Sequence, residues 1–234
     1  MGNNKNEVEK FYDDYVSNQK LYSFNERHYF LYHKMITYGL NPNSSVLELG
    51  CGIGIITSLI NKKVKYGKIV TCDISEKSIE VSKKNNISDN IEFFVSDILD
   101  FKYDNFIFDY ITFFDVLEHI PEENHEQIFK NIANNMSNSS KLLINIPTAE
   151  GINYFRKNKP EILQVIDQPL KMYKLLHHLS LAGLRLENFE LLSLWAERDY
   201  QFMVIVKEQE YDNKPVYKKR KTIVERIVNK IMKE

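Results

Sequence analysis

The sequence predicts an α/β fold in which helices cover both faces of a mostly parallel β-sheet. Short apolar runs alternate with amphipathic segments through the middle of the chain, and strands that alternate with helices form parallel sheets. The expected strands are residues 46–49, 68–72, 91–95, 106–114 and 142–146. The expected intervening helices are residues 55–60, 75–84 and 121–136, the last with Pro121 in its first turn.

Two helices are expected before this region. Apolar residues recur at helical spacing over residues 8–16 and 26–38, and the Asn-Pro-Asn break around Pro42 ends the second helix. We interpret residues 1–40 as a helical cap on a main domain that covers residues 41–210.

The last third of the chain is expected to complete the sheet. A helix over residues 170–179 ends at Gly183, and the strand-like runs 184–194 and 200–206 are close enough to pair antiparallel. The connection over residues 148–170 is long for a loop between a strand and a helix, which indicates a lid or an inserted helix.

Composition excludes several classes of protein. The chain has 234 residues, is 43% hydrophobic and 27% charged, and has a formal net charge of −1. This balance fits one globular core and excludes disordered, collagen-like and coiled-coil chains. No run approaches the roughly 20 apolar residues of a membrane helix, and the start lacks the apolar segment of a secretory signal. Cys51 and Cys72 are too few for a disulfide framework and have no metal-binding neighbours, so we expect a cytoplasmic protein without a metal.

Positive charge is concentrated at the end of the chain. Residues 214–234 hold eight Lys or Arg against two Glu, so the rest of the chain is net negative and no nucleic-acid partner is expected. Apolar residues at helical spacing predict that residues 211–234 form a basic amphipathic helix. Such a helix docks on its own domain or on a second copy, or lies weakly on a membrane surface.

A glycine-spaced turn follows the first expected strand. Residues 46–54 read Val-Leu-Glu-Leu-Gly-Cys-Gly-Ile-Gly, a buried strand that leads through a turn into a helix. Glycines permit unusual backbone angles and close approach of a ligand, and the helix start offers free N–H groups. Ile55 occupies the place where a dinucleotide fingerprint needs Gly or Ala, and the Lys-Ser/Thr of a phosphate loop is absent.

Acidic residues follow the next strands. Asp73 ends the second strand, at the separation from the turn where a carboxylate reaches a ribose diol, and Asp97 ends the third. Asp115 ends the fourth, so these groups converge at the carboxyl edge of the sheet. Helix capping for Asp73 and a turn role for Asp97 are the competing interpretations.

These motifs together resemble class I S-adenosylmethionine-dependent methyltransferases, in the group of small-molecule enzymes that includes quinone-pathway O-methyltransferases. The resemblance covers residues 46–147 and rests on the E-x-G-x-G-x-G turn from Glu48 to Gly54, on Asp73, on the Asp97-Ile98 pair, and on the run from Phe114 to Pro121. It implies a Rossmann-like three-layer sandwich with seven strands, the last antiparallel.

The resemblance also implies S-adenosylmethionine as the cofactor and S-adenosylhomocysteine as its product. The glycines would back the methionine moiety, Asp73 would bind the ribose hydroxyls, Asp97 and Ile98 would surround the adenine, and Phe114 and Asp115 would lie beside the methionine amino group. The residues expected to contact or support the cofactor are Tyr15, Glu48, Gly50, Cys51, Gly52, Gly54, Asp73, Ile74, Asp97, Ile98, Phe114 and Asp115.

Methyl transfer to oxygen needs a group that removes a proton, and His119 is the preferred base because neutral imidazole is available near pH 7. Packing beside the cofactor is the competing role for His119. Glu118 is expected to orient His119 or to cap the next helix, and His28 is a second candidate base.

We expect the enzyme to methylate a small molecule, at a hydroxyl oxygen of a sugar-like or specialised metabolite. The basic stretch 153–160 suggests an acidic acceptor, with a solvated loop as the alternative. Methylation of nitrogen, of a carboxylate or of a macromolecule are alternatives, as is a protein that binds S-adenosylmethionine without turnover.

Overall fold

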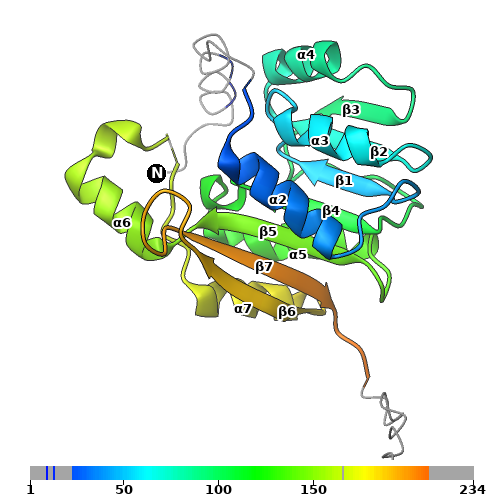
Figure 1. Cartoon of the computed structure of the whole chain (residues 1–234). Coiled ribbons are helices and arrows are strands. Elements are labelled where there is room, and N and C mark those ends of the chain that lie inside the picture. The colour runs from blue at the N-terminus through cyan, green and yellow to red at the C-terminus, as the bar shows by residue number, and fades with distance from the viewer. Residues whose placement is uncertain (1–8, 10–12, 14–22, 165, 211–234) are drawn as a thin grey trace, which may run out of the picture.

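A computed structural model describes residues 9, 13, 23–164 and 166–210 of the chain. It contains a seven-stranded sheet with the strand order β3-β2-β1-β4-β5-β7-β6 (Figure 1). The strands are β1 (Val46–Leu49), β2 (Ile69–Asp73), β3 (Ile91–Val95), β4 (Tyr110–Phe114), β5 (Lys141–Pro147), β6 (Leu184–Leu192) and β7 (Tyr200–Lys207). The predictions for Tyr15, for the helix over residues 8–16 and for the tail 211–234 lie outside the described residues.

Strand directions match the predicted fold class. Strands β1 to β5 pair in parallel, whereas β7 runs antiparallel to both β5 and β6. The chain leaves β1 on one side toward β2 and returns on the other side at β4, so the sheet order reverses between β1 and β4. Ligands of open α/β sheets lie at such a reversal, outside the carboxyl ends of the strands.

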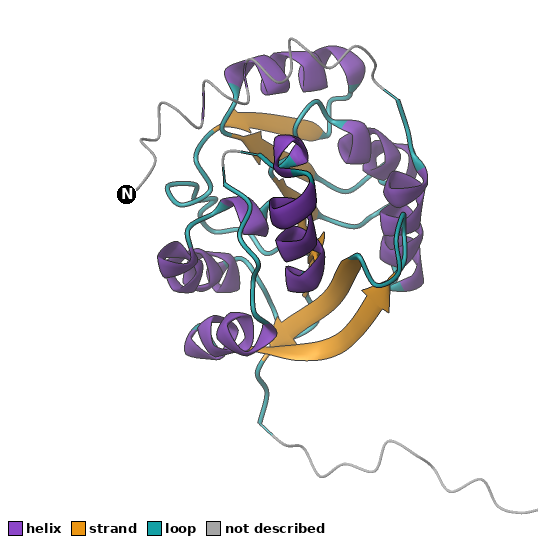
Figure 2. Ribbon diagram, turned by 90° about the vertical axis from the view of Figure 1, so that its left-hand side faces the viewer, coloured by secondary structure: helices purple, strands orange, loops and turns teal. Residues whose placement is uncertain are grey.

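Helices cover both faces of the sheet (Figures 1 and 2). Buried residues of α2 (Glu26–Thr37) and α3 (Ile55–Lys63) form one apolar core with the sheet. Those of α5 (His125–Asn134) and α7 (Met172–Leu181) form a second. All four residues of β1 are buried because the strand lies between the two cores. The structure also contains α4 (Glu76–Asn85) and α6 (Ala149–Asn158).

Two predicted elements were too long. The apolar run 106–114 yields a strand only from Tyr110, because Phe106 and Phe108 pack with Tyr103 in an aromatic cluster instead of extending the sheet. The single helix predicted over 121–136 is a short 3₁₀ turn, Glu122–Asn124, followed by α5.

The long connection after β5 contains the inserted helix α6 and a 3₁₀ turn, Pro160–Ile162. Thr148 caps α6 by accepting a hydrogen bond from the Gly151 N–H. Figure 1 places α6 beside the β6–β7 loop, at the end of the sheet where β5 finishes. No helix among the described residues has the length and apolar composition that crossing a membrane requires.

Candidate functional site

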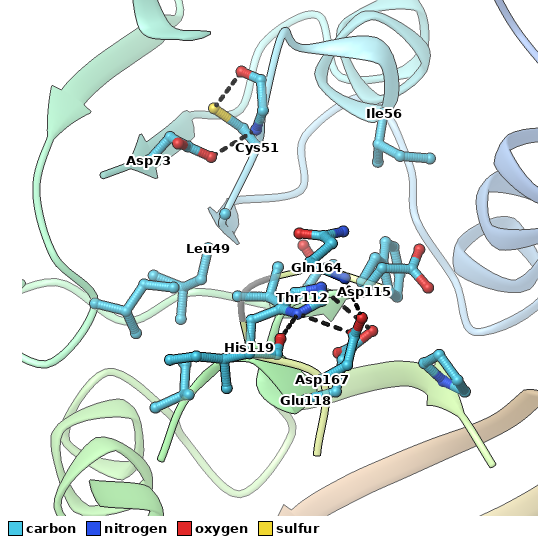
Figure 3. A pocket seen from close by; sticks show the side chains of 18 of the residues that line it. Leu49, Cys51, Ile56, Asp73, Thr112, Asp115, Glu118, His119, Gln164 and Asp167 are labelled. Atoms are coloured by element: carbon cyan, nitrogen blue, oxygen red, sulfur yellow. Dashed lines mark hydrogen bonds and ion pairs between the residues drawn. The ribbon is translucent and has the colours of Figure 1, made fainter. Parts of the chain in front are cut away.

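A cavity of about 930 Å³ lies at the carboxyl ends of β1 and β4, where the sheet order reverses (Figure 3). Its volume is near the upper end of the range of roughly 300–1,000 Å³ for small-molecule sites, so it has room for a cofactor and an acceptor together. The predicted site residues that line it are His28, Glu48, Gly50, Cys51, Gly52, Asp73, Ile74, Asp97, Ile98, Phe114, Asp115, Glu118 and His119. Of the predicted residues that the structure describes, Gly54 alone is not part of the lining.

All three glycines of the β1–α3 turn have positive φ angles, and a side chain would meet different surroundings at each of them. A Cβ on Gly50 would lie 2.4 Å from the Val116 side chain, and one on Gly54, where α3 begins, would lie 2.2 Å from Ser82 Oγ. A Cβ on Gly52 would meet nothing within 4 Å, and Gly52 lines the cavity. The turn thus leaves open space directly against the main chain at Gly52, as a closely bound ligand requires.

Asp73 joins the glycine turn to the end of β2. Its carboxylate accepts hydrogen bonds from the Gly52 N–H at 2.8 Å and from the Ser75 N–H at 2.9 Å. The predicted alternative, that Asp73 caps α4, is wrong, because Ser75 is the N-cap and accepts from the Ser78 N–H. Each carboxylate oxygen has a second lone pair, so Asp73 retains acceptor capacity toward the cavity. Burial raises the pKa of Asp73 above its ordinary value.

Glu48 lies beneath the turn and is 4% exposed. Thr57 Oγ1 donates a 2.6 Å hydrogen bond to its carboxyl, and the sheet register places Thr71 and Thr112 on either side of it. Burial raises the pKa of Glu48 to about 8, so its carboxyl is neutral at pH 7.

The carboxylate of Asp97 also forms a local hydrogen bond, which it accepts from the Leu99 N–H at 2.9 Å. This bond holds the turn after β3 and fits the predicted turn role, while Asp97 and Ile98 both line the cavity. Cys51 is buried, and burial raises the pKa of its thiol well above the ordinary value, so it is a poor nucleophile.

An ion pair crosses the cavity from α2 to the end of β4. Arg27 Nη1 lies 2.9 Å from Asp115 Oδ2 and donates a 3.1 Å hydrogen bond to the Tyr200 hydroxyl. The guanidinium also lies 5.3 Å from the centre of the Trp195 ring. Burial raises the pKa of Asp115 to about 6, against the opposing effect of Arg27.

The imidazole of His119 is held on one side by the connection over residues 148–170, called the insertion below. His119 Nδ1 forms a hydrogen bond with the carbonyl oxygen of Ile166 and lies 3.2 Å from Asp167 Oδ1. Glu118 Oε1 lies 3.8 Å from His119 Nε2. In Figure 3 these groups and Asp115 lie across the cavity from Asp73 and Cys51. Burial lowers the pKa of His119, which favours a neutral ring at pH 7.

The expectation that Glu118 caps the next helix is wrong. Its side chain is 2% exposed within the 3₁₀ turn Leu117–His119, and Asn124 is the residue before α5. Burial raises the pKa of Glu118 well above its ordinary value.

His28 has a local structural role. Its Nδ1 accepts a hydrogen bond from the Asn25 N–H in the capping box that begins α2. The remaining proton of the neutral ring is therefore on Nε2, which makes that atom a donor and not a base. Burial lowers the pKa of His28 to about 4.

The cavity is acidic. Within the described residues, its lining has eight Asp or Glu side chains and one Arg, which is the ion-paired Arg27. The basic side chains of the insertion are elsewhere: Arg156, Lys157 and Lys159 are exposed and do not line the cavity. The basic side chains of residues 153–160 are therefore solvated, as the alternative interpretation predicts. The residues of α6 that line the cavity include Ile152 and Phe155.

The sequence analysis did not single out Arg27, Asp167, Trp195 and Tyr200, which are among the polar and aromatic residues that line the cavity. Arg27 precedes the buried Leu31 by four positions, and residues four apart lie on the same face of a helix, so this spacing could have placed Arg27 on the inner face of α2. Trp195 is positioned by Asp199, whose carboxylate accepts from the Trp195 and Ala196 N–H groups. Among the described residues, no cluster of three or more His, Cys, Asp or Glu side chains is arranged to hold a metal ion.

Comparison with known proteins identifies the central segment. Residues 46–138 match the family model described as a methyltransferase domain. A malonyl-[acyl-carrier protein] O-methyltransferase of Priestia megaterium is 33% identical over 89 residues, 38% of this chain and 31% of that protein. A ubiquinone biosynthesis O-methyltransferase of Coxiella burnetii is 36% identical over 91 residues, 38% of this chain and 37% of that protein. The matches thus span about a third of each relative.

Solved structures share the fold over nearly the whole chain. Magnesium protoporphyrin IX methyltransferase from Synechocystis PCC 6803, solved with bound SAH, has a TM-score of 0.70 at 15% identity, and the match covers 88% of this chain and all of that one. The DhpI–SAH complex has a TM-score of 0.65 at 16% identity, covering 87% of this chain and 96% of that one. The predicted Rossmann-like three-layer sandwich is therefore confirmed.

Proposed function

We propose that this chain, whose residues 46–138 match the methyltransferase domain model, is an S-adenosylmethionine-dependent enzyme that methylates a hydroxyl oxygen of a small molecule. The observation that carries the proposal is one cavity that brings the glycine turn and Asp73 together with Asp115 and His119. Two relatives are named O-methyltransferases, one of malonyl-[acyl-carrier protein] and one of ubiquinone biosynthesis, and these names support methyl transfer to oxygen.

The residues around the glycine turn fit the cofactor. The open space at Gly52 admits a ligand against the main chain, and the remaining acceptor capacity of Asp73 suits the ribose hydroxyls. Asp97 and Ile98 are placed to border the adenine. A net acidic cavity also suits a ligand that carries both a sulfonium and an ammonium group.

The Arg27–Asp115 pair is complementary to the zwitterionic end of the cofactor. Asp115 would accept from the methionine ammonium, and Arg27 would donate to the carboxylate. Arg27 Nε supports this placement because, in the described part of the chain, it is buried without a hydrogen-bond partner. Charge-assisted bonds from Arg to a carboxylate are among the stronger polar contacts in proteins.

When bound, the cofactor supplies a methyl group that is electrophilic because it is attached to a sulfonium. The protein must then align the acceptor hydroxyl with that methyl and take up the hydroxyl proton as the new bond forms. His119 is the proposed base, since burial keeps its ring neutral and it lines the cavity. His28 is not retained as a base, because its Nδ1 is engaged by the Asn25 N–H.

The lining also restricts the acceptor. The cavity offers no lysine and no unpaired arginine among the described residues, so an anionic acceptor would find repulsion rather than a counter-charge. Apolar contact surface comes from Ile152, Phe155 and Trp195. We therefore propose an acceptor without negative charge, with one apolar face that is aromatic or the C–H face of a sugar ring.

Two free cysteines in the described chain support a reducing, cytoplasmic location.

The proposal is tested with S-adenosylmethionine labelled on the methyl group and a panel of phenols, neutral sugars, carboxylic acids and amines. We expect label on neutral hydroxylated acceptors, and a loss of about 10²- to 10⁴-fold in the rate of His119→Ala with unchanged cofactor affinity. His33→Ala, on the exposed part of α2, is the matched control. Label on carboxylic acids or amines, with His119→Ala fully active, would contradict the assignment of a hydroxyl acceptor.

A further inference from the structure

We propose that Asp167 is a positioning residue that, together with the Ile166 carbonyl oxygen, holds the Nδ1 side of the His119 ring and stabilises the ring when it is protonated. The inference rests on the proposed role of His119 as the base. It concerns a residue of the insertion, 48 positions beyond His119 in the chain.

The contacts of His119 determine which ring nitrogen is protonated. Nδ1 faces two oxygen atoms, the carbonyl oxygen of Ile166 and Oδ1 of Asp167 at 3.2 Å. A carbonyl oxygen only accepts hydrogen bonds, so Nδ1 carries the proton and donates it. The lone pair of the neutral ring is then on Nε2, the nitrogen that a base uses when the other is engaged by a carboxylate.

Asp167 is itself held in place. Its second carboxylate oxygen accepts from the Gln164 N–H, and its backbone oxygen accepts from Arg156 Nη2. The next residue, Gln168, donates its N–H to the Glu118 carbonyl at 2.9 Å. The insertion is therefore bonded to the turn that carries His119, and the side chains of His119 and Asp167 are 10% and 11% exposed.

The charged surroundings assign Asp167 a distinct effect on the ring. Glu118 Oε1 lies 3.8 Å from Nε2, and burial raises the pKa of Glu118 well above the ordinary value, which favours its neutral form. Beyond Glu118, Arg27 and Asp115 neutralise one another. The Asp167 carboxylate lies 3.2 Å from Nδ1, closer to the ring than Glu118, and it offsets the cost of a buried imidazolium when the ring takes up a proton. Its field acts to raise the pKa of His119 against the larger effect of burial.

The experiment is a pH titration of the full chain labelled with ¹⁵N-histidine, followed by long-range ¹H–¹⁵N spectra that distinguish the two tautomers, with His119→Asn to assign the signals. For the wild type we expect the proton of the neutral ring on Nδ1 in about 10-fold excess or more. Asp167→Asn keeps an oxygen for the Gln164 N–H but removes the charge, so the pKa of His119 should fall further. Its rate of methyl transfer to a hydroxyl acceptor should fall about 10- to 100-fold.

Arg156→Met is the matched control, because it releases the insertion at the Asp167 backbone but leaves the carboxylate unchanged. We expect it to leave the tautomer and the pKa of His119 unchanged. Asp167→Glu should restore part of the effect and serves if Asp167→Asn does not fold. A wild-type proton on Nε2, or the same pKa of His119 in Asp167→Asn, would overturn the inference. These signals require no cofactor, so the outcome is separate from failure to bind S-adenosylmethionine.

Discussion

Replacing Glu48 by Gln should make the protein more stable at alkaline pH, because the fold holds this carboxyl in its protonated form. The folded pKa of Glu48 is about 8 and the ordinary value is 4.5, so the folded state retains a proton that the unfolded chain loses between these values. This contribution to stability is fully present below pH 4.5 and is lost as the pH rises through 8. The difference corresponds to about 5 kcal/mol above pH 8.

The glutamine introduced by Glu48→Gln carries no ionisable proton and keeps an oxygen for the 2.6 Å hydrogen bond from Thr57 Oγ1. The variant should therefore avoid this loss of stability. A protein of this size gains about 2–4 °C in melting temperature per kcal/mol, so Glu48→Gln should melt about 10 °C or more above the wild type at pH 9. Calorimetric melts from pH 5 to pH 9 measure the difference. Glu80→Gln, at an exposed position of α4, is the control and should follow the wild type. Parallel melting curves for the wild type and Glu48→Gln would refute the reasoning.

Two further predictions concern the glycine turn and its acidic partner. Asp73→Ala should weaken S-adenosylmethionine binding by about 1–3 kcal/mol, or about 5- to 150-fold. Asp73→Asn should weaken it by less, because Asn keeps one acceptor oxygen. If calorimetry shows unchanged affinity in a folded Asp73→Ala variant, the placement of the ribose is rejected. Gly50→Ala should lower the free energy of unfolding by about 1–3 kcal/mol more than Gly52→Ala in urea titrations, because its Cβ lies 2.4 Å from Val116. Gly52→Ala should instead mainly weaken cofactor binding, and equal effects of the two on affinity would count against the open space at Gly52 as the ligand position.

The sheet and its glycine turn could be predicted because their signals are local. A buried strand followed by glycines at positive φ occupies nine consecutive residues, and acidic residues at strand ends need only the order of the parallel strands. The same local signals failed over residues 106–109, where apolar side chains pack on one another without forming a strand.

The side of the cavity around Arg27 and Asp167 could not be predicted from the sequence, because it is formed by contacts between distant segments. Arg27 meets Asp115 because α2 packs over the end of β4, and Asp167 meets His119 because the insertion returns to the turn after that strand. Neither pair has a short spacing in the sequence. The exposure of Arg156 and Lys157 likewise follows from which face of α6 turns toward the cavity, which their charge alone does not predict.

The most direct test of the central claim is calorimetric titration of the purified chain with S-adenosylmethionine, S-adenosylhomocysteine and NAD in parallel. The account predicts micromolar binding of the first two and none of NAD, because the turn from Gly50 to Gly54 and Asp73 would hold the ribose and methionine portions of the same ligand. Binding of NAD alone would contradict the assignment of the cavity as a methyltransferase site.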